Sequence, residues 1–113
     1  MQLLHLFSII KHMDKSKRAD FIFCIGYEGA TALVDGAMKA KCGNFTTQQL
    51  AEAGLFRAAC ASALFSENPE EIRAFIDFYN QKAGTALTTP EELSKLFGVS
   101  LEDFAGKNVR VLK

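Results

Sequence analysis

The sequence predicts a small α+β domain that is mainly helical: a compact bundle of five or six short helices with a minor two-stranded sheet. Three observations lead to this prediction. Three segments begin with a helix-capping pattern, a short run rich in Phe and Ile is typical of a buried strand, and the last residues alternate as a strand does. The two strands are expected at about 20–26 and 108–112, paired with each other.

Length and composition are those of an ordinary folded domain. The chain has 113 residues, 49% of them apolar and 23% charged. This length predicts a single domain over residues 1–113. Its 13 basic and 13 acidic residues cancel, so binding of nucleic acid would require a local basic patch.

The N-terminal segment has an apolar run, residues 3–10, that is too short to span a bilayer, and we expect no membrane partner. Leu3, Phe7 and Ile10 keep helical spacing. They form either an exposed stripe for a protein partner or a cap over the core. A further interpretation is that residues 1–12 are a non-native or flexible extension.

The strand predicted at 20–26, DFIFCIG, packs five apolar residues into a run that ends at Gly26. From Ala30 onward the apolar positions follow a helical period, and Gly43 is expected to end this helix. The competing interpretation is a hairpin in which residues 30–35 form the second strand. The helix is preferred, although Gly36 in its interior weakens it.

Capping residues predict where three later helices begin. Each has a capping residue and, three positions on, a Gln or Glu able to reach back to it; the pairs are Thr46 with Gln49, Asn68 with Glu71, and Thr89 with Glu92. Between the first two starts, the segment LFRAACASALF carries one charge and a wide apolar face, which predicts a central helix. The alternating segment KNVRVLK predicts the terminal strand.

A Gly-x-x-Gly turn, IGYEGAT, stands between the predicted strand and the predicted helix. Backbone N–H groups of Gly26, Tyr27, Gly29 and Thr31 would be the candidate site for a nucleotide or phosphate at a helix N-terminus. The motif lacks the third Gly of a dinucleotide fingerprint and the Lys of a P-loop, and Glu28 adds a negative charge. A tight turn without a ligand is the preferred interpretation.

Motifs for catalysis or metal binding do not stand out. Three cysteines without a CxxC pair favour reduced thiols in a cytoplasmic protein over a disulfide framework or a zinc site. His5 and His12 have no metal-ligating partner at a suitable spacing. The acidic pairs all open helices, where the dipole favours them. We therefore predict no cofactor, no metal and no catalytic residue, and enzymatic activity is not favoured.

The stretch TPEELSKLFGVSLEDF, residues 89–104, is similar to the helix-turn-helix motif, with Gly98 at the turn and Ser100 capping the second helix. Recognition of DNA would require that helix to present hydrogen-bond donors, but it offers Glu102 and Asp103. The residues that could contact nucleic acid are Ser100, Lys107 and Arg110.

The leading prediction is a non-catalytic, cytoplasmic module for protein interaction or self-association, with Leu3, Phe7 and Ile10 as candidate contacts. The alternative is a nucleic-acid-binding or transcription-linked domain of helix-turn-helix type. Nucleotide or phosphate binding at the Gly turn is a minor alternative. The sequence predicts neither the partner nor the oligomeric state.

Overall fold

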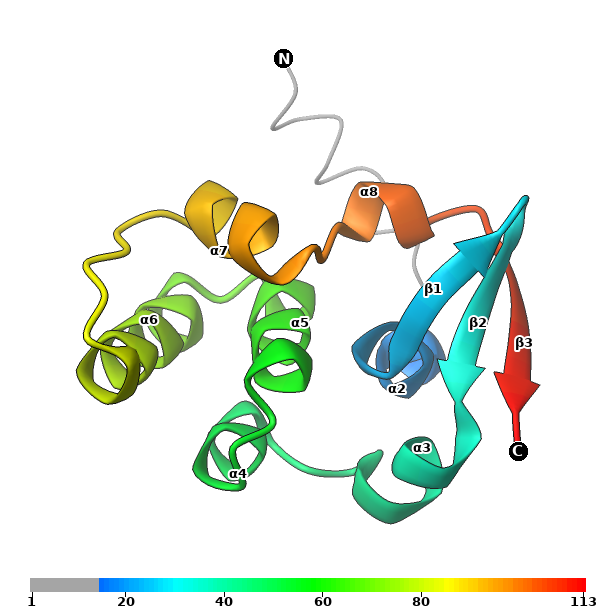
Figure 1. The fold of residues 1–113 in the computed structure, drawn as a ribbon, viewed down its shortest axis with the longest axis horizontal. Helices are drawn as coiled ribbons and strands as arrows, with labels where there is room; N and C mark the ends of the chain where they lie inside the picture. Colours follow the sequence, from blue (N-terminus) through cyan, green and yellow to red (C-terminus); the bar gives the residue numbers. More distant parts are fainter. Residues whose placement is uncertain (1–14) are drawn as a thin grey trace. The chain divides into compact units, whose positions relative to one another are not determined.

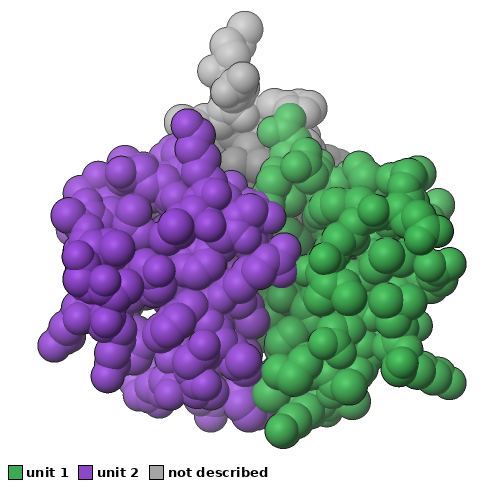
Figure 2. Space-filling model, viewed as in Figure 1, with its two compact units in different colours: residues 1–43, 100–113 green, residues 44–99 purple. Residues whose placement is uncertain are grey.

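A computed structural model describes residues 15–113 and confirms a mainly helical α+β fold. The chain divides into two compact units (Figure 2). Unit 1 holds residues 1–43 and 100–113, and unit 2 holds residues 44–99, so unit 2 is inserted in the chain between the two halves of unit 1. Whether the chain functions as the single domain expected from its length stays a prediction.

Unit 1 contains a three-stranded sheet with short helices (Figure 1). Its elements are η1 (Lys15–Lys17), α2 (Arg18–Ile22), β1 (Cys24–Glu28), β2 (Thr31–Asp35), α3 (Gly36–Cys42), α8 (Leu101–Phe104) and β3 (Asn108–Leu112). The strand order is β1-β2-β3; β1 pairs with β2 in antiparallel and β2 with β3 in parallel. Parallel pairing of β2 with β3 requires a long connection, which α3, all of unit 2 and α8 provide.

The hairpin interpretation of residues 24–35 is correct, and the helix predicted from Ala30 is wrong in its first part. Ala32 and Val34 are buried and alternate with half-buried neighbours, the period of a strand. Gly29 has φ +60° in the connecting turn, a conformation that glycine adopts without strain. The helix begins only at Gly36, where the Asp35 side chain caps it by accepting from the Met38 N–H at 3.1 Å.

The strand predicted at 20–26 also changes. Its first residues belong to α2, and the strand runs from Cys24 to Glu28. The expected direct pairing with 108–112 is replaced by pairing of both segments with β2, so the sheet has three strands and not two. The additional helix α2 helps to raise the number of α-helices within residues 15–113 to seven, above the five or six predicted.

The interior of unit 1 is apolar, and a partly buried ion pair lies beside it. Phe21 of α2 and Phe104 of α8 are buried and meet edge to face, with ring centroids 5.2 Å apart. Asp20, also buried, accepts from Lys39 Nζ of α3 at 2.6 Å. These contacts join α2 to α8 and to α3.

Unit 2 consists of four helices: α4 (Thr47–Glu52), α5 (Phe56–Ser66), α6 (Pro69–Ala83) and α7 (Pro90–Phe97). Reciprocal capping boxes form at Thr46 and Thr89, as predicted. Hydrogen bonds donated by Thr88 and Thr89 hold the pKa of Glu92 below its ordinary value. Asn68 caps α6 by accepting from the N–H groups of Glu70 and Glu71, but the predicted return bond from Glu71 does not form. The Asn68 N–H donates to Ser66 Oγ instead, and the Glu71 carboxylate accepts from Thr47.

Helix α5 occupies the centre of unit 2, as its apolar composition predicted. It contacts α4, α6 and α7, and residues 58–63 are all buried. Small side chains on most of its circumference let the neighbouring helices approach closely. A stretch buried on all sides, such as residues 58–63, cannot present a binding face, so a binding surface is sought elsewhere in the chain.

Candidate interaction surface

The outer edge of β3 is an open side of the sheet in unit 1. Among the described strands β3 has β2 as its one neighbour, and their register is unbroken from Asn108 to Leu112. The Asn108 N–H donates toward β2, to the Ala30 carbonyl at 2.9 Å. Because successive residues of a strand direct their backbone groups to opposite sides, Val109 and Val111 direct their N–H and C=O groups to the open side.

The opposite edge, β1, is less regular. Its register against β2 shifts between Cys24 and Gly26, which places Ile25 in an irregularity of the ladder. Such a bulge is a common way of blunting an edge strand, because it twists the edge and interrupts the row of available backbone groups. The two edges therefore differ: β1 is interrupted, and β3 offers a regular template.

Exposed apolar side chains gather on these two edge strands. Four large hydrophobic side chains are exposed in the described part of the chain, and three of them, Ile25, Tyr27 and Val111, lie on β1 or β3. Val111 of β3 is 43% exposed. An apolar side chain beside unused backbone donors and acceptors is typical of a strand that pairs with another chain.

Positive charge follows β3. Lys107, Arg110 and Lys113 lie on or next to this strand, and no acidic residue follows Asp103 in the sequence. The net charge of the whole chain is zero, but the charges are unevenly divided between the units. Unit 1 has nine of the 13 basic and six of the 13 acidic residues, and unit 2 has four basic and seven acidic residues. Unit 1 thus has a net positive charge and unit 2 a net negative one.

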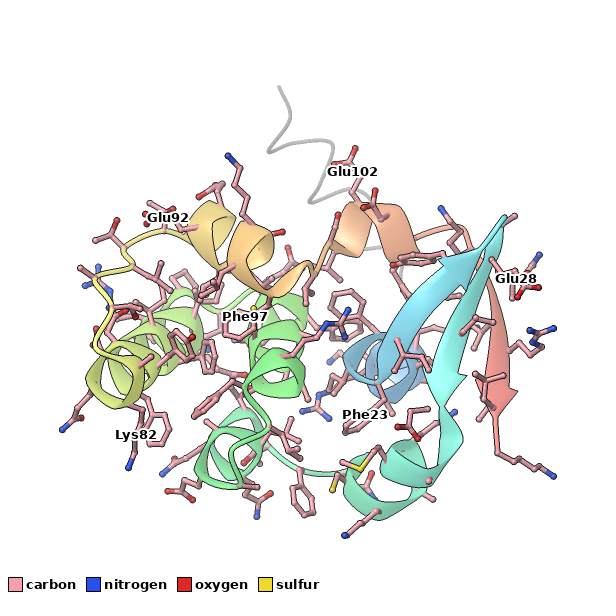
Figure 3. The ribbon with its side chains drawn as sticks, viewed as in Figure 1. Phe23, Glu28, Lys82, Glu92, Phe97 and Glu102 are labelled. Atoms are coloured by element: carbon pink, nitrogen blue, oxygen red, sulfur yellow. The ribbon has the colours of Figure 1, made fainter. Side chains whose placement is uncertain are left out.

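The cations beside β3 have neighbours within unit 1. Arg110 Nη2 lies 3.6 Å from Glu28 Oε2, and both side chains are more than half exposed, so the ion pair contributes little stability. Lys107 Nζ lies 5.4 Å from the centroid of the Tyr27 ring. Figure 3 labels Glu28 near the turn that joins β1 to β2.

The Gly turn joins two strands and does not form the strand-to-helix junction on which the minor phosphate-binding alternative was based. Gly26 and Tyr27 lie in β1, Thr31 begins β2, and Gly29 is in the hairpin turn between them. The helix whose N-terminus would supply N–H groups is absent here, since α3 begins only at Gly36. The hypothesis of nucleotide or phosphate binding loses the structural premise on which it depends.

The N-terminal stripe of Leu3, Phe7 and Ile10 lies outside the described residues. Its role as a partner-binding surface stays a prediction. The same holds for the interpretation of residues 1–12 as an extension.

The helix-turn-helix similarity divides between the two units, because α7 belongs to unit 2 and α8 to unit 1. Its local features are confirmed: Gly98 ends α7 with φ +63°, and the Ser100 hydroxyl accepts from the Asp103 N–H at 3.2 Å. However, α8 has only four residues, of which Leu101 and Phe104 are buried. Its exposed residues are acidic, and one of them, Glu102, is labelled in Figure 3.

The candidate nucleic-acid residues are accordingly not brought together on a recognition helix. Ser100 caps α8, Lys107 lies beyond its end near Tyr27, and Arg110 lies on β3 beside Glu28. A helix in the major groove must direct donors at base edges, and the exposed part of α8 offers carboxylates.

Unit 2 contains a polar cluster that was not predicted from the sequence. Thr47 Oγ1 donates to Glu71 Oε2 at 2.6 Å and lies 2.6 Å from Ser62 Oγ, so one residue from each of α4, α5 and α6 takes part. The only indication in the sequence was Glu71, and it was predicted to cap its own helix and not to contact another one. Ser62 is 2% exposed, so the cluster resembles a structural link and not an accessible nucleophile.

The thiol of Cys60 is also unsuited to nucleophilic chemistry. Burial raises its pKa from 9.0 to about 12, with nearby Arg57 opposing the shift, so the thiolate is strongly disfavoured at neutral pH. Within residues 15–113 no group of three or more His, Cys, Asp and Glu side chains is placed to hold a metal ion.

Comparisons of the chain with protein-family models, with curated proteins and with solved structures find no match. None of the described helices is long and apolar enough to cross a membrane.

Proposed function

We propose that this chain is a non-catalytic protein-interaction module and that the outer edge of β3 is its contact surface. One observation carries the proposal: Val109 and Val111 direct backbone donors and acceptors away from β2, on a strand with an unbroken register and an exposed valine. An extended segment of another chain can satisfy these groups by strand addition, a recurrent mode of peptide recognition.

A cytoplasmic location is part of the same proposal. All three cysteines are free and buried, which suits a reducing compartment. Fractionation of native cells tests this; recovery of the protein outside the reducing compartments would contradict it.

The test of the contact surface compares three full-length proteins. Val111→Pro removes a backbone N–H that points to the open side, and proline is tolerated on an edge strand when its missing N–H is not part of the ladder. Val111→Thr is the matched control, because it keeps the N–H and the β-branched shape. Each protein is used as bait in a native extract, and its self-association is followed by sedimentation velocity.

We expect a bound protein, or a second copy, to be retained by the wild type and by Val111→Thr and lost from Val111→Pro. Circular dichroism shows whether the variants keep the fold. If all three folded proteins retain a partner equally, the β3 edge is not the contact surface, whichever partner is retained.

A further inference from the structure

We infer that the occupant of the β3 edge is an extended, acidic peptide segment of a partner protein, which adds to the sheet as a fourth strand. This inference rests on the proposed function and specifies the chemistry of the partner.

The backbone of β3 sets the position of the added strand. Val109 and Val111 supply its hydrogen-bonding partners, because Asn108, Arg110 and Leu112 direct their own groups toward β2. The added strand must therefore lie directly alongside residues 109–111. Its side chains then alternate between the two faces of the sheet in step with those of β3.

The charges of β3 select the side chains of the peptide. Tyr27, Ala32 and Val109 are neighbours across the sheet register and share one face. Continued alternation places Val111, Lys107 and Lys113 on this face, in agreement with the contact of Lys107 with the Tyr27 ring. Arg110 lies on the other face, beside Glu28. The complement is a strand with apolar residues opposite the valines and carboxylates opposite the three cations.

A second copy fits this edge less well. Pairing β3 with β3 of another molecule would bring six cationic side chains to the seam, because each copy has one on the strand and one beside each of its ends. Neither strand carries an acidic residue. Like charges in opposite positions destabilise a pair of strands. Pairing β3 with β1 of another molecule would meet the irregular register at Cys24 and Gly26.

Nucleic acid also fits less well. Single-stranded nucleic acid is usually held by aromatic side chains on which bases stack, and β3 carries none. Phosphates would use the cations but would leave the unpaired N–H and C=O groups of the valines without strand partners. The charge and the backbone together favour a peptide.

The probe is the synthetic peptide acetyl-Glu-Thr-Val-Glu-Val-Thr-Glu-amide. Its sequence is a palindrome, so its three Glu side chains lie opposite Lys107, Arg110 and Lys113 in both the parallel and the antiparallel orientation. The matched controls are the same peptide with Lys in place of Glu, and the acidic peptide N-methylated at its two valines and at the residue after each. The N–H groups that face β3 belong to the valines in an antiparallel strand and to the residues after them in a parallel strand. Because the controls alter the peptide, the protein remains in its native state.

Binding is followed by amide chemical shifts of the full-length, ¹⁵N-labelled chain. The acidic peptide is expected to shift the amides of Val109 and Val111 most, with weaker binding at high salt. Either control peptide, or Val111→Pro, is expected to bind at least about tenfold more weakly, because backbone bonds or charge pairs are lost. Val111→Thr should bind within about threefold of the wild type.

Three outcomes would overturn the inference: no binding of the acidic peptide, equal binding of the Lys peptide, or equal binding of the N-methylated peptide. Concentration-dependent shifts of the same amides without peptide would assign the edge to a second copy instead. Tighter binding of a single-stranded oligonucleotide, unaffected by Val111→Pro, would assign the cations to nucleic acid. If the peptide fails while the bait experiment succeeds, only the partner chemistry is wrong; if both fail, the proposed function is wrong too.

Discussion

The two units of this chain are built in opposite ways. Unit 2 forms from consecutive helices, three of which start at local capping residues, and residues 58–63 of its central helix α5 are buried. Unit 1 depends on pairing between β2 and β3, two segments on either side of unit 2 in the sequence. The difference teaches where function can reside: the central part of α5 in unit 2 is buried, and unit 1 leaves a regular strand edge available.

The largest expected effect tests the closed core of unit 2. Leu50 of α4 is fully buried, and Leu50→Ala should lower the free energy of unfolding by about 2–5 kcal/mol through lost burial and the cavity left behind. The control is Leu96→Ala in α7, where the leucine is 50% exposed, and its effect should be much smaller. Urea denaturation measures the free energy of unfolding of both variants. A loss for Leu50→Ala as small as that for Leu96→Ala would contradict a core position for Leu50.

The buried thiol of α5 gives the second prediction. Because the pKa of Cys60 is about 12 in the folded protein and 9.0 is its ordinary value, the unfolded chain loses this proton first as the pH rises. The associated stability is complete below pH 9 and is lost toward pH 12, at up to about 1.4 kcal/mol per pH unit.

Cys60→Ala removes this group, so the comparison isolates its contribution from those of other titrating side chains. The free energy of unfolding of the wild type should fall more steeply with pH than that of the variant. Parallel curves over this interval would contradict a strongly buried thiol.

These two predictions concern features that sequence reasoning largely found. The caps at Thr46 and Thr89 were predictable because their partners are three residues away. The central position of α5 followed from its near absence of charge. The link between Thr47 and Glu71 was missed because it depends on how two helices pack, which spacing along the chain does not reveal.

Unit 1 was harder to predict for the same physical reason. The alternation at the C-terminus predicted β3, but nothing local identifies β2 as its neighbour. Residues 30–35 suit a helix and a strand almost equally, and tertiary pairing decides between them. The open edge of β3 was beyond sequence reasoning, because it depends on the side to which the Asn108 N–H points.

Gly36 gives the third prediction and tests the long-range pairing in unit 1. It is the first residue of α3, and glycine is a weak helix former. Helix propensity alone therefore predicts that Gly36→Ala stabilises the protein by roughly 1 kcal/mol. A Cβ at this position would instead collide with the Leu112 carbonyl oxygen of β3. We therefore expect a net loss of about 1–3 kcal/mol.

The matched control is Ala40→Gly, at an exposed position within the same helix, where the propensity cost of roughly 1 kcal/mol should appear without a collision. Hydrogen exchange of the β3 amides distinguishes the two variants, since only Gly36→Ala should increase exchange at residues 108–112. Stabilisation by Gly36→Ala would show that β3 does not approach α3 closely.

The smallest expected effect is the most informative about the open edge. Glu28 pairs with Arg110 at 3.6 Å, and both side chains are well exposed. Glu28→Gln should therefore change the free energy of unfolding by less than about 0.5 kcal/mol. The same substitution removes a carboxylate that competes with an acidic peptide for Arg110, so binding of the acidic probe should become about two- to threefold tighter.

Arg110→Gln is the complementary variant and should weaken binding of the probe while also leaving stability nearly unchanged. Titration of both variants with the acidic peptide, followed by amide shifts, checks the pair. If Glu28→Gln binds the peptide no better than the wild type and Arg110→Gln binds it no worse, Arg110 is not part of the contact. The affinity of the edge would then come from the backbone and valines of β3 alone, and the contrast in charge between the two units would have no role in choosing the partner.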